Sequence, residues 1–390
     1  MDRRTFLGGA CCVSLAGCLR LQGGSGESTA TSSPTATATA EADGVNPVDE
    51  TTTTESRVSV DDLGLDRVRD LPATLYGGVF TRQGSFVGVT DDGIGQVSPD
   101  GTVEWESDRI ADELFPQLPE AIDFADGTVF VGCSNDNRDA TRVYAFDDAS
   151  GQRLWSHDTD PDNWFVSSVA ADDRAVFYAS NQLGSDANPI VTARDHDGES
   201  LWSRPFPSET PVETLLLHDD RLYLSSDRLY AMDRNDPESL TQVEAPSGGG
   251  LTRSGDAAFD RSVNRIDLAD GTVEWTTRIS SDYGPGIRPS VRDGVVVTGT
   301  DAGYVLAIDA DAGDIRWEAR VDGPVTEIAL TDDYAFVVDR NGEFYVLDLT
   351  EGVLRHQRTV RDEEGVATHV AVSGTELIFD ADRTVYELVE

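Results

Sequence analysis

The side chains best suited to acid–base or metal chemistry are few and scattered along the chain. The five histidines stand at His157, His196, His218, His356 and His369. Each falls at the end of an expected strand or in an expected turn, so we expect them to be exposed and not to ligate a metal. Asp158, Asp160 and Asp162 have the spacing that opens a calcium-binding loop, but the glycine and glutamate that complete such a loop are missing. In a chain with 72 acidic residues, chance explains this spacing better.

Cysteine chemistry is equally limited. The four cysteines are Cys11, Cys12, Cys18 and Cys133, and only Cys133 lies outside the N-terminal segment. No disulfide is therefore expected within the folded part. We interpret Cys133 as a small buried strand residue, with a reactive thiol as the alternative. Because the sequence also lacks a nucleophile elbow, a phosphate loop and a His-Glu-x-x-His motif, we predict no catalytic and no metal-binding residue.

The N-terminus has the pattern of an export signal. Arg3 and Arg4, followed by Phe6 and Leu7, resemble a twin-arginine signal. The apolar run 7–19 has about 13 residues, which is too short for the roughly 20 that cross a bilayer as a helix. Residues 1–17 are therefore predicted to be a signal peptide and not a membrane span.

The apolar run ends in Leu-Ala-Gly-Cys at positions 15–18, which resembles a lipobox. In this interpretation Cys18 receives a lipid and anchors an exported protein to the outer face of the cell membrane without spanning it. The alternative is ordinary cleavage that discards Cys18. Residues 18–56 form the predicted anchor and a low-complexity Thr/Ser-rich stalk, which cannot bury a core and is expected to be disordered.

The charge is strongly negative. With 30 basic and 72 acidic residues the formal net charge is −42, and every basic residue is arginine. The negative electrostatic potential of such a chain repels phosphate groups, so a nucleic acid partner is excluded. An excess of acidic residues without lysine resembles the composition of proteins from salt-loving archaea. At molar salt the Debye length is about 3 Å, so salt screens the repulsion between surface carboxylates. An acidic protein of a mesophile is the alternative.

The body of the chain is a repeat. Seven segments carry the pattern Asp-x-x-x-Gly-x-x-x-Trp or a variant of it, with steps near 40 residues. The repeat residues that we assign to architecture are Gly101, Trp105, Gly151, Trp155, Gly198, Trp202, Gly271, Trp275, Gly313 and Trp317. We expect each glycine to accept a positive φ in a turn and each tryptophan to pack between neighbouring units.

Each complete repeat is predicted to form four short strands. In the sixth, turn pairs delimit strands at 287–291, 295–299, 304–309 and 315–321. An eighth unit has only three strands before the chain stops, so we predict that a segment near 57–69 supplies the fourth. Residues 57–390 are thus predicted to form an all-β, eight-bladed propeller of four-stranded antiparallel blades, closed by pairing of the N- and C-terminal segments. Seven longer blades are the alternative.

The pattern Ala307-x-Asp309-x-x-x-Gly313-x-x-x-Trp317, repeated at 145–155, resembles the PQQ-like (pyrroloquinoline quinone) repeat. That family includes quinoprotein dehydrogenases and the scaffold lipoprotein of the bacterial outer-membrane assembly machinery. The resemblance implies the propeller fold over about 75–390. It does not imply the cofactor, because the quinone enzymes use an adjacent cysteine pair and calcium ligands that have no counterpart in the repeats. We therefore expect no PQQ and no other cofactor.

The loops indicate where a partner would bind. In each repeat the first-to-second and third-to-fourth strand turns are short and share one face of the ring. The loops on the opposite face are long in the first three repeats, at 107–120, 134–141, 157–163 and 181–189. Phe115, Trp164 and Phe165 lie within or beside these loops and are our candidate face for a protein or small-ligand partner. Alternatively, they plug the central channel.

These observations favour a non-catalytic, lipid-anchored binding or scaffold module at the cell surface. The alternative function is a PQQ-dependent or other oxidoreductase that acts on a small alcohol or sugar in the channel.

Overall fold

The computed structural model separates the chain into residues 1–57 and 58–390. It describes residues 64–70, 80–90, 93–110, 114–116, 121–134, 141–159, 164–182, 188–208, 210–243, 249–277, 283, 286–360, 367, 369–379 and 382–389. The predicted export signal, Cys18 and the stalk lie outside these residues. Across the described ranges, no helix has the length and apolar character needed to cross a membrane.

The described strands form eight antiparallel sheets, which are the blades of a propeller. Blade 1 contains β2 (Phe80–Arg82), β3 (Ser85–Val89), β4 (Ile94–Val97) and β5 (Val103–Glu106). Blade 2 contains β6 (Phe115–Pro116), β7 (Ile122–Ala125), β8 (Thr128–Ser134), β9 (Thr141–Asp147) and β10 (Arg153–Thr159). Blade 3 contains β11 (Trp164–Ala171), β12 (Val176–Gln182), β13 (Ile190–Arg194) and β14 (Ser200–Pro205). Blade 4 contains β15 (Thr214–His218), β16 (Arg221–Ser225), β17 (Leu229–Asp233) and β18 (Asp236–Gln242).

The second half of the ring repeats the same order. Blade 5 contains β19 (Thr252–Ser254), β20 (Ala257–Phe259), β21 (Asn264–Asp267) and β22 (Val273–Thr276). Blade 6 contains β23 (Ser290–Arg292), β24 (Val295–Gly299), β25 (Tyr304–Asp309) and β26 (Ile315–Arg320). Blade 7 contains β27 (Val325–Leu330), β28 (Tyr334–Asp339), β29 (Glu343–Asp348) and β30 (Leu354–Thr359). Blade 8 contains β31 (Val370–Ser373), β32 (Glu376–Phe379), β33 (Asp382–Val389) and β1 (Gly64–Asp70).

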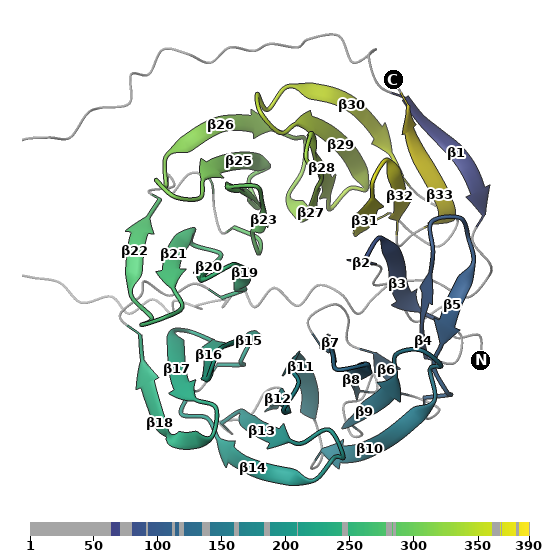
Figure 1. Ribbon diagram of the computed structural model, residues 1–390. Helices are drawn as coiled ribbons and strands as arrows, with labels where there is room; N and C mark the ends of the chain where they lie inside the picture. The colour runs from purple at the N-terminus through teal and green to yellow at the C-terminus, as the bar shows by residue number, and fades with distance from the viewer. Residues whose placement is uncertain are drawn as a thin grey trace, which may run out of the picture. The chain divides into compact units, whose positions relative to one another are not determined.

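The blades stand in a ring, with the first strand of each blade at the centre and the last at the rim (Figure 1). The ring closes as predicted. Strand β1, from the N-terminal side, pairs antiparallel with β33 from Gly64–Val389 to Asp70–Thr384 and supplies the fourth strand of blade 8. The prediction of eight four-stranded blades is confirmed, with the innermost position of blade 2 divided between β6 and β7, which both pair with β8.

The innermost strand of blade 6 is shorter than predicted. Its predicted span 287–291 is observed as β23 at Ser290–Arg292, because Pro289 has no N–H to donate to the ladder. Pairing resumes beyond the proline, where the Ile287 amide donates to the Gly299 carbonyl at 2.8 Å. Strands β24 and β25 keep the predicted bounds.

The hydrophobic core lies between blades and not within one sheet. One cluster joins Val297 and Trp317 of blade 6 to Val325, Val337 and Tyr345 of blade 7, all at most 7% exposed. Because each blade buries one sheet face against the next, a single blade has no core of its own.

The repeat glycine and tryptophan form one contact between neighbouring blades. Gly352 has φ of +70°, and a Cβ added there would lie 2.6 Å from the Trp317 ring of the preceding blade. The Trp317 indole N–H donates to the Leu349 carbonyl in the same turn at 2.8 Å. Trp155 is placed against Gly198 in the same way. The glycine is therefore required both for its backbone conformation and for the close approach of the indole.

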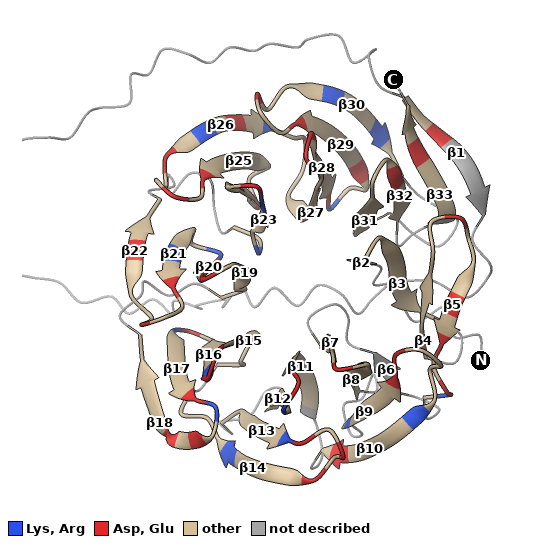
Figure 2. Cartoon of the chain, in the orientation of Figure 1, with Lys and Arg blue, Asp and Glu red and all other residues tan. Residues whose placement is uncertain are grey.

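Aspartates shape the turns, and Figure 2 shows many of the Asp and Glu positions at the turns between strands. In the β7–β8 and β23–β24 turns, Asp126 (φ 47°) and Gly127, and Asp293 (φ 46°) and Gly294, all have positive φ, which is the two-residue hairpin geometry that matches strand twist. Asp309 accepts hydrogen bonds from two amides of its turn, those of Asp311 at 3.0 Å and Ala312 at 2.8 Å. Much of the negative charge thus serves turn formation.

Arginines connect the turns of neighbouring blades. The pairs that cross between blades are Arg82–Asp148 at 2.6 Å, Arg174–Asp220 at 2.8 Å, Arg292–Asp332 and Arg234–Asp172. Arg234 is the most buried of these cations, with 2% of its side chain exposed, and its guanidinium lies 5.1 Å from the Phe177 ring centroid.

Candidate functional site

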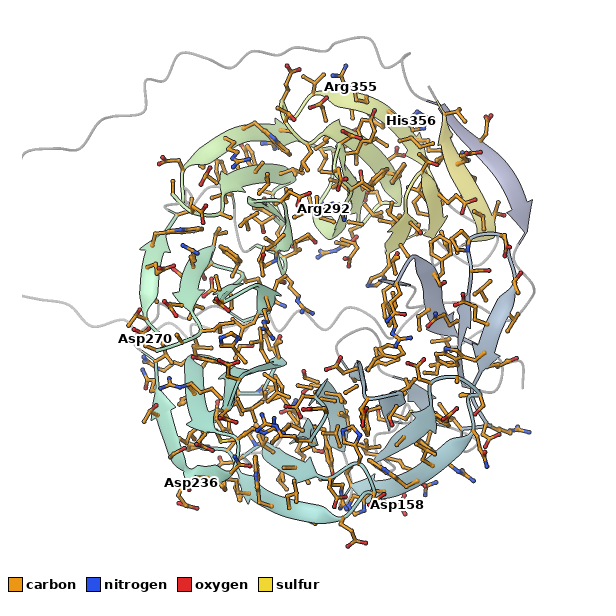
Figure 3. All side chains as sticks on the ribbon, viewed as in Figure 1. Asp158, Asp236, Asp270, Arg292, Arg355 and His356 are labelled. Carbon is orange, nitrogen blue, oxygen red and sulfur yellow. The ribbon has the colours of Figure 1, made fainter. Side chains whose placement is uncertain are left out.

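The central channel contains a cavity of about 420 Å³ between the inner segments of blades 2 to 6. We call it the channel cavity. Its lining residues are Ile122, Asp123, Ser168–Ala171, Thr214–Leu217, Leu251, Arg253 and Arg288. The apolar part comes mainly from β11 and β15, the charged part comes from Asp123 and the two arginines, and Ser168 and Thr214 are the remaining polar residues. Figure 3 shows the side chains that surround the centre of the ring.

Hydroxyl groups hold the inner strands in place around this channel. Side chains on one blade donate to backbone carbonyls of a neighbouring blade at four seams. Thr81 donates to Val372 at 2.7 Å, and at 2.6 Å Ser167 donates to Val212, Thr252 to Pro289 and Ser290 to Ile328. These bonds satisfy carbonyls that short inner strands leave unpaired. They link the inner segments of neighbouring blades around the channel.

Asp123 is the only carboxylate that lines the channel cavity among the described residues. Burial raises the pKa of this carboxyl, while hydrogen bonds from the backbone amides of Ala171 and Phe124 oppose the shift. Both amides donate at 2.8 Å, and that of Ala171 belongs to the neighbouring blade. Asp123 therefore joins blades 2 and 3 at the cavity wall.

Arg253 and Arg288 enter the channel cavity from blades 5 and 6. Arg253 is exposed and donates to the carbonyls of Leu217 at 3.0 Å and Gly255 at 2.9 Å. Arg288 is half-buried, and its Nε donates to Thr252 Oγ1 at 3.1 Å. Sequence reasoning missed both arginines. The available signal was the polar triplet 252–254, which stands where most other inner strands carry mainly apolar residues.

The predicted partner-face residues lie at one end of two neighbouring inner strands. Phe115 is in β6, which pairs with Ser134 at the end of β8, and Trp164 begins β11, where it pairs with Gln182. Phe165 follows it and is half-buried. The fold thus brings the three positions together at the long-loop ends of blades 2 and 3. Most of the long loops lie outside the described residues.

The prediction that all five histidines are exposed is wrong. His218, the last residue of β15, is 6% exposed, and its Nε2 lies 3.8 Å from both Asp219 Oδ2 and Asp256 Oδ1. The other four are half-buried. Strand-end positions did not reveal this burial because the turn that contains Asp256 belongs to the next blade.

The other residues considered for chemistry have structural surroundings. Cys133 is fully buried in β8, as predicted. Asp158 pairs with Arg142, whereas Asp160 and Asp162 lie outside the described residues. Within the described ranges, no three His, Cys, Asp or Glu side chains are grouped to hold a metal. The described residues also offer no adjacent cysteine pair that would fit the quinone of the dehydrogenases.

Comparison with known proteins places this ring in a family. Residues 52–243 and 260–386 match the family described as outer membrane protein assembly factor BamB. The chain belongs to this family. The match includes strands of all eight blades, so the BamB family assignment applies to the whole propeller.

Curated BamB relatives are distant. Assembly factors BamB of Moranella endobia and Xanthomonas campestris are 26% and 27% identical over 251 and 215 residues. These alignments cover 54% and 53% of this chain, and 62% and 46% of the relatives. The chain thus matches about half the length of the curated relatives, all of which are named as assembly factors and not as enzymes.

Solved structures show the same fold. BamB from Moraxella catarrhalis superposes with a TM-score of 0.55 at 15% identity and covers 84% of this chain and 98% of that chain. The computationally designed protein Ika8 superposes with a TM-score of 0.62 at 14% identity, covering 83% and 98%. At these identities the likeness concerns the fold alone.

Proposed function

We propose that this protein is a non-catalytic scaffold that holds a protein partner at the cell envelope. Membership of the BamB family across the whole propeller supports this proposal most directly. A rigid ring with short turns on one face and long loops on the other is also suited to present a single binding face. We assign the partner face to the long-loop ends of blades 2 and 3, around Phe115, Trp164 and Phe165.

Site-specific photo-crosslinking tests this face. A benzophenone side chain in place of Phe165 should crosslink to a discrete partner protein in membranes prepared in molar salt. The matched control is the same probe at Asp332, an exposed residue of the short-turn face with 70% of its side chain accessible. Equal crosslinking at the two positions, or none at Phe165, would contradict the assignment.

The alternative that Phe165 and Trp164 only plug the channel gives a different result. In that case, replacing both with alanine lowers the melting temperature and leaves partner recovery per folded molecule unchanged. If they form the partner face, recovery falls for the folded protein.

We further propose export and anchoring through a lipid on Cys18, with the paired Arg3 and Arg4 as part of the export signal. Cys18→Ser should release the protein from membranes into the medium. Retention of the variant in the membrane fraction would refute the anchor. The acidic surface without lysine supports a halophilic source, and unfolding on dilution from molar to low salt would test salt dependence.

We also propose that the scaffold acts without PQQ. The purified native protein should then show no near-ultraviolet absorbance beyond that of its aromatic residues. It should also show no dye-linked alcohol oxidation, with or without added quinone and calcium. Either signal would favour the oxidoreductase alternative.

A further inference from the structure

The lining of the channel cavity carries more basic than acidic residues, whereas the whole chain carries more acidic than basic residues. The protein has 30 basic and 72 acidic residues, yet the described lining of the cavity contains two arginines and one aspartate. The aspartate is half-buried and accepts hydrogen bonds from two backbone amides, whereas Arg253 is exposed. In a protein this acidic, a solvent-accessible site with net positive charge is a selective place for an anion.

Arg253 has hydrogen-bonding capacity to spare. Its two hydrogen bonds both go to backbone carbonyls, those of Leu217 and Gly255. A guanidinium carries more N–H donors than these two bonds use. None of the ion pairs between described residues includes Arg253. These two bonds orient the guanidinium without neutralising it.

Arg288 is held on the same cavity by the neighbouring blade. Its Nε donates to Thr252 Oγ1, and that hydroxyl donates to the Pro289 carbonyl. A Cβ added at Gly250 would lie 3.3 Å from Arg288 Cβ, so this side chain emerges against glycine backbone. Thr252 directly precedes Arg253 in the chain. One short strand therefore presents Arg253 and also positions Arg288.

The rest of the cavity lining is partly apolar. Leu215–Leu217 of β15 form its main apolar side, with Leu217 half-buried, and Ser168 and Thr214 are its other polar residues. Guanidinium groups bind carboxylate and phosphate oxygens through parallel N–H donors, and an adjoining apolar wall favours a ligand with a hydrocarbon part.

We propose that the channel cavity binds a small organic anion, with its carboxylate or phosphate group at Arg253 and Arg288 and its apolar body against Leu215–Leu217. The site shares no residue with the partner face proposed above, although β11 contributes Trp164 and Phe165 to that face and Ser168–Ala171 to the cavity. The two functions can therefore fail separately.

Calorimetric titration of the purified protein at constant molar salt tests the site with three probes of matched chain length. Hexanoate and hexyl phosphate carry the anionic group, and hexanamide lacks the charge. We expect hexanoate or hexyl phosphate to bind at least tenfold more tightly than hexanamide, since a hydrogen bond to a charged group contributes about that factor or more. The stronger of the two anions identifies the preferred head group.

Variants then locate the site. Arg253→Gln should weaken anion binding about tenfold or more with little loss of stability, because this side chain is exposed. Arg288→Gln should weaken it similarly. The matched control is Arg228→Gln, which removes the same charge from an exposed arginine whose carboxylate contact is with Asp227 and which does not line the cavity.

Four results would overturn the proposal. These are no binding of either anion, equal affinity for anions and hexanamide, equal weakening by Arg253→Gln and Arg228→Gln, and unchanged binding in Arg253→Gln. Crosslinking at Phe165 is measured independently, so its failure would affect only the partner face.

Discussion

The ion pair between Asp172 and Arg234 connects blade 3 to blade 4, and its removal should destabilise the ring measurably. Asp172 lies in the β11–β12 turn, and Arg234 follows β17. Both guanidinium Nη atoms contact the carboxylate, with Nη2–Oδ1 at 2.9 Å. Arg234 is 2% exposed and Asp172 is 26% exposed. Replacing Asp172 by Asn keeps the size of the side chain and an oxygen for the turn amides, but leaves a buried cation without its counter-charge.

The magnitude follows from this burial. Removing one partner of a fully buried pair costs about 3–5 kcal/mol, whereas an exposed pair contributes about 0–1 kcal/mol. Because a quarter of the Asp172 side chain is open to solvent, water can partly compensate the loss. We therefore expect Asp172→Asn to lower the free energy of unfolding by about 2–3 kcal/mol.

Urea unfolding at constant molar salt measures this difference. The control is Asp173→Asn, which removes the same charge from the next residue, where the side chain is 79% exposed and lies 3.8 Å from Arg174. It should change stability by less than about 0.5 kcal/mol. If the two variants unfold at the same urea concentration, the buried pair does not stabilise the ring.

The pH dependence gives a second measure of the same pair. Burial alone would raise the pKa of Asp172, but hydrogen bonds from Arg234 and from the amides of Arg174 and Ala175 lower it from 3.8 to about 2. A folded-state pKa below the unfolded value means that the stabilisation is complete above the unfolded pKa and is lost as the pH falls toward 2. Asp172→Asn should therefore flatten the stability curve between about pH 4 and 2. If the stability of Asp172→Asn fell with pH as steeply as that of the unmodified protein, Asp172 would not be the source of the acid-labile stabilisation.

Three further predictions concern the architecture of the ring. Gly352→Ala should lower the free energy of unfolding by about 3 kcal/mol, because alanine disfavours the positive φ and its Cβ would clash with Trp317. Gly294→Ala should lower it by about 1 kcal/mol, because Gly294 also has a positive φ but lies in open space. Equal losses in urea unfolding would contradict the contact between Gly352 and the indole. Burial raises the pKa of the Cys133 thiol, so it should react with iodoacetamide only after unfolding, and rapid labelling of the native protein would refute its burial. Deleting 64–70 exposes the edge of β33 and should produce concentration-dependent association, seen by light scattering; a monomeric variant of full stability would contradict closure by β1.

Most of the fold could be predicted from the sequence because its signals are local and repeated. Aspartate–glycine turns delimit β24 and β25 at their observed bounds, and the unpaired three-strand unit at the C-terminus pointed to β1. The exception at β23 arose from Pro289, whose missing N–H ends the regular ladder. Strands and turns within one repeat can therefore be predicted from the sequence.

The channel cavity could not be predicted in the same way. Arg253, Arg288 and Asp123 come from three blades, and no spacing along the chain indicates that they share one cavity. The burial of His218 and the placement of each tryptophan against the next blade's glycine likewise depend on neighbours that are not adjacent in sequence.

Pairing of β1 with β33 also sets the order in which the chain can fold. Gly64 can pair only after Val389 has been synthesised, so β1 has no partner strand until the last blade is complete. During that time the backbone of β1 stays unpaired, in a topology whose closing contact joins segments very distant in sequence, which slows folding and favours association between chains. Closure of the ring therefore depends on an intact β33, because a chain that lacks this strand offers β1 nothing to join.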